Sequence, residues 1–96
     1  MTMTVIGLVP LEEFMKKHAD VRASVQSWLA EAQDAEWLTP QEIKTRYSSA
    51  DFLSDNRVLL NLKGKHYRLL FKVNYRYHRV QVLKIGTHAE YDKWNL

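Results

Sequence analysis

The chain has 96 residues, of which 46% are hydrophobic and 26% are charged, proportions typical of a globular domain rather than a disordered segment. It contains no cysteine, which excludes disulfides, cysteine-based zinc sites and thiol catalysis. The longest early apolar run, residues 5–9, is too short for a signal peptide or a membrane span. We therefore expect one domain over residues 1–96, located in the cytoplasm and without a membrane partner.

The charge is distributed unevenly along the chain. Residues 1–56 hold nine acidic and five basic residues, whereas residues 57–96 hold two acidic and nine basic residues, a net charge of +7. Such an asymmetry predicts that the second half meets a polyanion such as a nucleic acid. A solvated basic face without a partner is the alternative interpretation.

The first half of the chain has the spacing of helices. A short strand is expected within residues 2–7, followed by a helix from Pro10 and a second helix for which Asp20 is the expected N-cap. Their apolar faces, spaced as on a helix, predict much of the core. These faces are Leu11, Phe14, Met15 and His18 in the first helix, and Val21, Val25, Trp28, Leu29 and Ala32 in the second.

A third helix has the clearest local signal. Thr39 is placed as its N-cap, Pro40 as the first helical residue and Glu42 as the third, which together make a capping box. We expect this helix to end near Tyr47 and residues 48–51 to form a loop.

From Arg57 onward the apolar residues alternate with a period of two, which predicts strands over residues 57–62, 66–73 and 79–86. In the middle strand, one predicted face is core and the other is largely polar and cationic. The core face is Tyr67, Leu69, Phe71 and Val73, and the other is His66, Arg68, Leu70 and Lys72. The last strand has apolar residues on both faces, a conflict that a β-bulge would resolve. Helices followed by strands predict an α+β fold with an antiparallel sheet.

The chain ends with a second capping-box pattern, Thr87 to Glu90. It predicts one final helical turn with His88, Tyr91 and Asp92 on one side. An imidazole has an ordinary pKa of about 6.5 and exchanges protons near neutrality, so His88 is a candidate for proton transfer.

Arg68 is the most informative charged residue, because it lies within an apolar strand. A guanidinium there is unfavourable unless it is paired or faces a cleft that receives an anion. An ion pair with Glu90 or Asp92 is the structural alternative to a functional role. Lysines and arginines that neutralise phosphates are further candidates for RNA binding, namely Lys63, Lys65, Lys72 and Arg76.

Residues 84–93, KIGTHAEYDK, resemble the C-terminal signature of the HigB family of toxins, and residues 63–70 are similar to that family's glycine turn and arginine-bearing strand. The resemblance implies a RelE-like α+β fold: a short N-terminal strand, two to three helices, a twisted antiparallel sheet and a short C-terminal helical turn. It also implies a type II toxin that cleaves mRNA on the ribosome. The implied partners are rRNA, a HigA-like helix-turn-helix antitoxin and, only through that antitoxin, operator DNA.

The family motif maps onto Arg68, His88, Tyr91 and Lys93, which the resemblance implies as catalytic residues, with no metal and no other cofactor. Arg68 suits the phosphate, while Glu90 or Asp92 competes with His88 for the role of base. Two other functions explain the charge pattern equally well. One is a non-catalytic RNA- or DNA-binding module, and the other is a protein-interaction domain with a basic sheet face.

Overall fold

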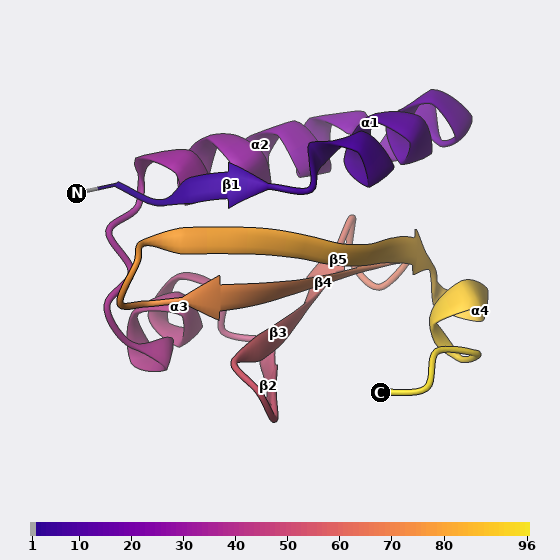
Figure 1. Cartoon of the computed structure of the whole chain (residues 1–96). Coiled ribbons are helices and arrows are strands. Elements are labelled where there is room, and N and C mark those ends of the chain that lie inside the picture. Colours follow the sequence, from indigo (N-terminus) through magenta and orange to yellow (C-terminus); the bar gives the residue numbers. More distant parts are fainter. Residues whose placement is uncertain (1) are drawn as a thin grey trace.

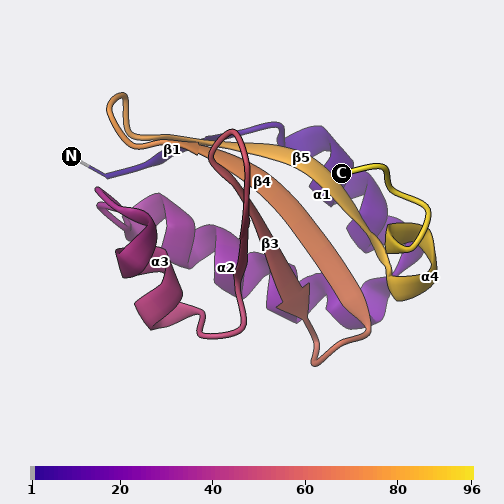
Figure 2. The ribbon, with the colours of Figure 1, turned by 90° about the horizontal axis from the view of Figure 1, so that it is seen from below.

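In the computed structural model, which describes residues 2–96, helices cover one face of a five-stranded sheet (Figure 1). In the view from below, the sheet lies in front of α1 and α2, so its other face is largely free of helices (Figure 2). The elements in chain order are β1 (Thr4–Ile6), α1 (Leu8–Lys17), the 3₁₀ turn η1 (Ala19–Val21), α2 (Arg22–Asp34), α3 (Pro40–Arg46), β2 (Asp51–Leu53), β3 (Arg57–Leu62), β4 (Tyr67–Asn74), β5 (Arg79–Thr87) and α4 (His88–Tyr91).

The sheet has the strand order β1-β5-β4-β3-β2. Strands β2 to β5 pair antiparallel, as the sequence predicts. Strand β1 adds a parallel edge, with Val5 opposite Val80 of β5. The predicted α+β fold is therefore confirmed, and the sheet is mixed because the first strand returns to pair with the last.

The core lies between the helices and one sheet face, and it contains most of the residues that the sequence predicts. Phe71 of β4 is fully buried, and its ring centroid lies 5.1 Å from that of Trp28 in α2. The predicted core face of β4 is buried throughout, from Tyr67 at 7% exposure to Phe71 at 0%. No helix of the described chain is long and apolar enough to cross a membrane.

Three local predictions are wrong. Helix α1 begins at Leu8 rather than at Pro10, because Gly7 adopts a left-handed conformation, with φ of 81°, and turns the chain from β1 into the helix. Asp20 is not an N-cap: it lies in η1 and its carboxylate accepts a hydrogen bond from Tyr67. Asp51, expected in a loop, begins β2.

A β-bulge in β5 resolves the conflict between the two apolar faces of that strand. Phe71 pairs with Val82 and Leu70 pairs with Lys84, so Leu83 is left without a partner in β4. Val82 therefore faces the core before the bulge, whereas Ile85 packs against the core after it. The shift also places Gly86, rather than a side chain, opposite Arg68.

Candidate active site

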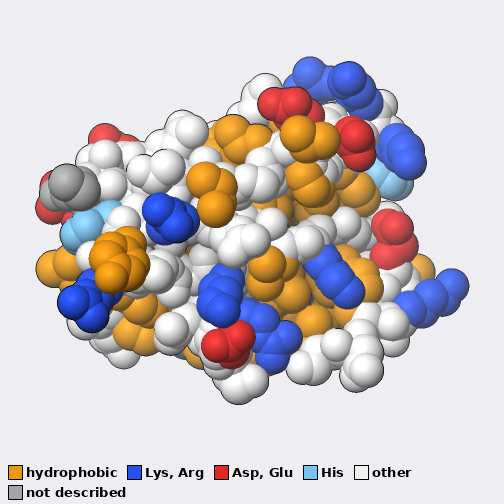
Figure 3. All heavy atoms as spheres, viewed as in Figure 1, with side chains coloured by type: hydrophobic (Ala, Val, Ile, Leu, Met, Phe, Trp, Pro, Cys, Tyr) orange, Lys and Arg blue, Asp and Glu red, His pale blue; other side chains and the backbone are white. Residues whose placement is uncertain are grey.

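The candidate site lies on the sheet face that α1 and α2 leave uncovered. The middle of this face is apolar, since Leu59 and Leu70 pair across β3 and β4 and are only 4% and 2% exposed. Polar and charged residues surround that pair, including Arg68 and Lys72 from β4. The space-filling view shows lysine and arginine side chains below β5 and at the end of the molecule where α4 lies (Figure 3).

Arg68 is partly buried and lies beneath an aromatic ring. Its guanidinium carbon is 5.1 Å from the centroid of the Tyr91 ring, a cation–π distance. Its Nη1 atom is buried and has no hydrogen-bond partner among the described residues. Neither Glu90 nor Asp92 pairs with it, so the structural alternative of an ion pair is not realised. Arg68 is therefore a cation without a carboxylate partner in residues 2–96.

Helix α4 holds the Tyr91 ring in place. The predicted capping box is present: the Thr87 hydroxyl accepts from the Glu90 N–H at 3.2 Å, and Glu90 Oε1 accepts from the Thr87 N–H at 2.9 Å. The His88 N–H also donates to the His66 carbonyl, at 3.1 Å, which ties the helix to the β3–β4 turn. Because the Glu90 carboxylate caps the helix, it is a poorer candidate for a base than Asp92.

His88 lies next to Tyr91, with ring centroids 6.0 Å apart. Its Nδ1 atom is 3.5 Å from Asp92 Oδ2, and both side chains are more than half exposed. Lys93 follows directly and is exposed. Arg68, His88 and Tyr91 therefore lie together at α4, and Lys93 follows that helix in the chain. We refer to Arg68, His88, Tyr91 and Lys93 as the α4 cluster. Among residues 2–96, no three His, Asp or Glu side chains form a metal-binding group.

The four expected RNA-binding residues are not gathered in one place. Lys63 and Lys65 lie in the β3–β4 turn, at the same end of the sheet as α4. Lys63 Nζ is 2.9 Å from Asp20, and Lys72 Nζ is 3.1 Å from Asp55, so both are ion-paired. Arg76 lies in the β4–β5 turn, which is at the opposite end of the sheet (Figure 1). Its guanidinium covers the Tyr77 ring.

A contact between η1 and the sheet has no signal in the sequence. Asp20 accepts hydrogen bonds from Tyr67 Oη, at 2.7 and 2.8 Å, and from Lys63. The hydrogen bond from Lys63, followed by the one from Tyr67, holds the pKa of Asp20 below its usual range. The hydrogen bond to Asp20, followed by burial, raises the pKa of Tyr67. These partners are more than forty residues apart, so no local pattern signals them.

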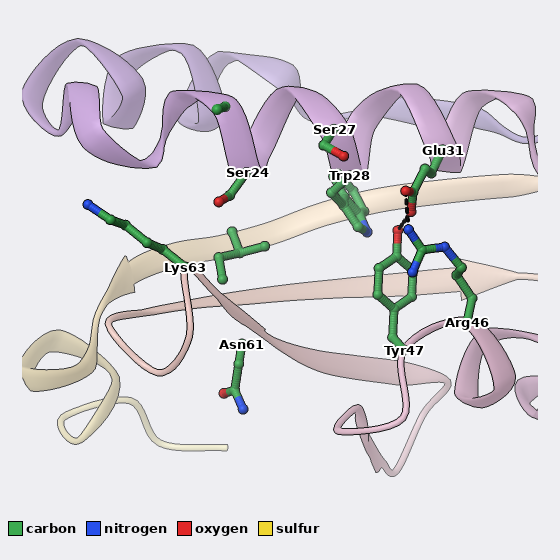
Figure 4. A pocket seen from close by; sticks show the side chains of 10 residues that line it. Ser24, Ser27, Trp28, Glu31, Arg46, Tyr47, Asn61 and Lys63 are labelled. Carbon is green, nitrogen blue, oxygen red and sulfur yellow. Dashed lines mark hydrogen bonds and ion pairs between the residues drawn. The ribbon is translucent and has the colours of Figure 1, made fainter.

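A hollow of about 380 Å³ lies between α2, α3 and β3, and no residue of the α4 cluster lines it (Figure 4). In it the Glu31 carboxylate accepts from Tyr47 Oη and pairs with Arg46. Burial, and then the bond to Glu31, raise the pKa of Tyr47 well above its usual range, so this phenol stays neutral. Because its charges are paired and its tyrosine is neutral, this hollow is less suited to chemistry on a phosphate than the α4 cluster.

Helices on one face of a five-stranded mixed sheet, with an arginine, an aromatic ring and an imidazole at one end of the other face, match a small α+β domain of the RelE-like class. Residues 21–94 match the HigB_toxin family, described as the RelE-like toxic component of a toxin-antitoxin system. The chain belongs to this family, which confirms the resemblance found in the sequence. It is also similar to the mRNA interferase HigB of Escherichia coli O6:H1, with 29% identity over 93 residues, which are 95% of this chain and 90% of that protein.

Proposed function

We propose that this protein is an endoribonuclease that cleaves mRNA on the ribosome without a metal cofactor, and that the α4 cluster is its active site. The proposal depends on the surroundings of Arg68. Its side chain is partly buried, lies under the Tyr91 ring and has no carboxylate partner among residues 2–96. A guanidinium in such a place favours binding of a phosphate, because its planar fork matches two phosphate oxygens. The similarity to an mRNA interferase supports RNA as the substrate.

The reaction is an attack of a ribose 2′-oxygen on the adjacent phosphorus. The 2′-OH loses its proton, the bond between phosphorus and the 5′-oxygen breaks, and that oxygen gains a proton. The products are a 2′,3′-cyclic phosphate and a 5′-hydroxyl. Arg68 stabilises the charge on the crowded phosphate, and Lys93 after α4 and Lys65 in the β3–β4 turn supply further positive charge.

His88 is the proposed proton-transfer group. Asp92, 3.5 Å from Nδ1, favours the tautomer with a proton on that nitrogen, so Nε2 is left to accept the proton of the 2′-OH. The Glu90 carboxylate is occupied by the Thr87 N–H and takes no part. Tyr91 holds the guanidinium of Arg68 under its ring.

The ribosome supplies the alignment of the RNA that this exposed site does not provide by itself. The side chains of His88 and Asp92 are 51% and 62% exposed, so the described residues enclose them only partly. Alignment of reacting groups is worth about 7–11 kcal/mol of a barrier. A ribosome that presents the mRNA in a fixed path provides that alignment, and rRNA then contacts the basic residues of the β3–β4 turn.

The proposal extends to partners and location. A helix-turn-helix antitoxin of the HigA kind would bind this toxin, and operator DNA would be bound only through that antitoxin. Both toxin and mRNA would meet in the cytoplasm. The support is the family itself, which is the toxic component of a toxin–antitoxin system.

The test is cleavage of an mRNA during translation in a purified system, with the new 5′ ends mapped. We expect the wild type to produce ends with a 5′-hydroxyl and a 2′,3′-cyclic phosphate, and Arg68→Ala to produce none while remaining folded by circular dichroism. Arg22→Ala, which removes an exposed arginine of α2, is the control and should cleave normally. Binding of RNA without new ends would favour a non-catalytic module, and 5′-phosphate ends that require added magnesium would overturn the mechanism.

A further inference from the structure

A second hollow, of about 300 Å³, lies between α1 and the end of β5. Strand β1 pairs only with residues 79–81 of β5, so the rest of that strand edge is left to face α1. Glu13 and Lys17 of α1 form one wall, and Lys84 and Trp94 form the other. In Figure 1 this region is at the right-hand end of the molecule, where α1 lies above the last part of β5 and α4.

Trp94 joins this hollow to the α4 cluster. Its ring centroid is 5.6 Å from that of Tyr91, which in turn covers Arg68. The ring packs against Gly86, where an added β-carbon would lie only 2.9 Å from Trp94 Cζ2. Lys84 Nζ is 5.6 Å from the ring centroid. The two rings are therefore neighbours, and a basic residue lies over the outer one.

We propose that this hollow binds the base of the nucleotide next to the scissile linkage, stacked on Trp94, with Lys84 and Lys17 on its phosphate. The inference rests on the proposed function and names a subsite of the same site. Every base has a π-face that stacks on an indole, and stacking of this kind is stronger than an exposed cation–π contact. When a base binds, the Lys84 ammonium would therefore move from the Trp94 ring to the phosphate of that nucleotide.

Packing alone does not account for the composition of the hollow. Trp28 and Trp37 are 2% and 6% exposed and belong to the core, whereas Trp94 keeps part of its surface open. A packing role accounts for the contacts of Trp94 with Gly86, Tyr91 and Lys84, but it gives no reason for a second lysine, Lys17, on the facing wall. Neither lysine has an ion-pair partner among residues 2–96.

Glu13 indicates which bases fit. Its carboxylate lines the same hollow and accepts hydrogen bonds but donates none. Adenine, cytosine and guanine carry an exocyclic amino group that donates to such an acceptor, whereas uracil has no amino group and offers only its ring N3–H. We therefore infer that the subsite prefers an amino-bearing base over uracil.

The first test measures binding without cleavage. The probes are two 2′-O-methyl tetranucleotides, all-adenine and all-uracil, which lack the attacking hydroxyl. Because Trp94 is the partly exposed tryptophan, we expect the adenine probe to quench tryptophan fluorescence in the wild type more than the uracil probe. Trp94→Phe should lose the quenching. Trp94→Ala and Lys17→Ala should weaken binding, the former about 5- to 150-fold as expected for loss of one stacked base, while Lys16→Ala, one residue away and outside the hollow, should not.

The second test reads the sequence around the cut sites in translated mRNAs. We expect Trp94→Ala and Glu13→Gln to cleave with a changed base preference at one flanking position, because the catalytic residues remain. If both variants cut with the wild-type preference and the adenine probe does not quench, the subsite does not exist. If the wild type cuts nothing while quenching is seen, the nucleotide site stands and the nuclease proposal fails, so the two failures are distinguishable.

Discussion

Gly86 lies opposite Arg68 in the β4–β5 pair, and the space that a side chain at Gly86 would fill belongs to the C-terminal segment. A β-carbon there would be 2.9 Å from Trp94 Cζ2 and 3.1 Å from Glu90 Cβ. The β-bulge at Leu83 is what brings a glycine to this position. The absence of a side chain therefore lets α4 approach the sheet next to Arg68.

We expect Gly86→Ala to reduce RNA cleavage at least tenfold, because the added methyl displaces α4, and an overpacked contact costs about 1–3 kcal/mol. The measurement is the cleavage rate together with the melting temperature. Gly64→Ala is the comparison, since Gly64 has φ of +69° and no atom within 4 Å of an added β-carbon. It should lose stability through backbone strain alone. Full activity of Gly86→Ala would contradict the role given to this glycine.

The two capping boxes provide a matched pair. Thr87→Ala and Thr39→Ala each remove an N-cap worth about 1 kcal/mol. We expect similar losses of stability by chemical denaturation. Only Thr87→Ala should reduce cleavage, because Thr87 begins the helix that carries His88 and Tyr91. Equal effects on cleavage would mean that α4 does not position the site.

The Tyr91 ring covers Arg68, so the role proposed for Tyr91 depends on its ring. We expect Tyr91→Phe to keep cleavage within about threefold of the wild type, and Tyr91→Leu to lose about tenfold or more, because a cation–π contact requires the ring and not the hydroxyl. The measurement is the cleavage rate of each variant on the same mRNA. A loss of about 10²-fold or more in Tyr91→Phe would instead identify the phenol as a proton donor.

The contact of Asp20 with Lys63 and Tyr67 makes stability depend on pH. The pKa of Asp20 is lowered in the folded protein, so the folded state favours the carboxylate and gains stability above the unfolded pKa of about 3.9. That gain is lost as the pH falls through the lower, folded pKa. We expect Asp20→Asn to be less stable than the wild type at pH 7 and the difference to shrink in acid. Melting curves from pH 7 to pH 3 measure this difference in stability. Asp34→Asn, at the exposed end of α2, is the control.

Phe71 is the centre of the core, fully buried and in contact with Trp28 and Trp37. We expect Phe71→Ala to lower the free energy of unfolding by about 3–5 kcal/mol, because the cavity cannot close in a packed interior. Phe52→Ala is the control, since Phe52 is 39% exposed. Urea unfolding of both variants makes the comparison, and a similar loss for the two would contradict the assigned core.

The candidate site was predicted in part and for identifiable reasons. Arg68 stood out because a charge within an apolar strand is unusual, and His88 and Tyr91 because a capping box places them on one helical turn. Trp94 had no such signal, since its neighbours Gly86 and Lys84 are set by the bulge and by the path of the chain after α4. Arg76 carried the same charge signal as the others, but the length of β4 places it at the far end of the sheet.

The sequence by itself determined the helix faces, the alternation along β4 and both capping boxes. These follow from local rules, since a period of 3.6 or 2 and a cap three residues away involve only neighbours in the chain. The tertiary structure alone decided the parallel pairing of β1 with β5, the contact of Asp20 with Tyr67, and the place of Trp94 over Gly86. Each of these depends on how separate elements pack, and a one-residue bulge was enough to change which side chains meet beside Arg68.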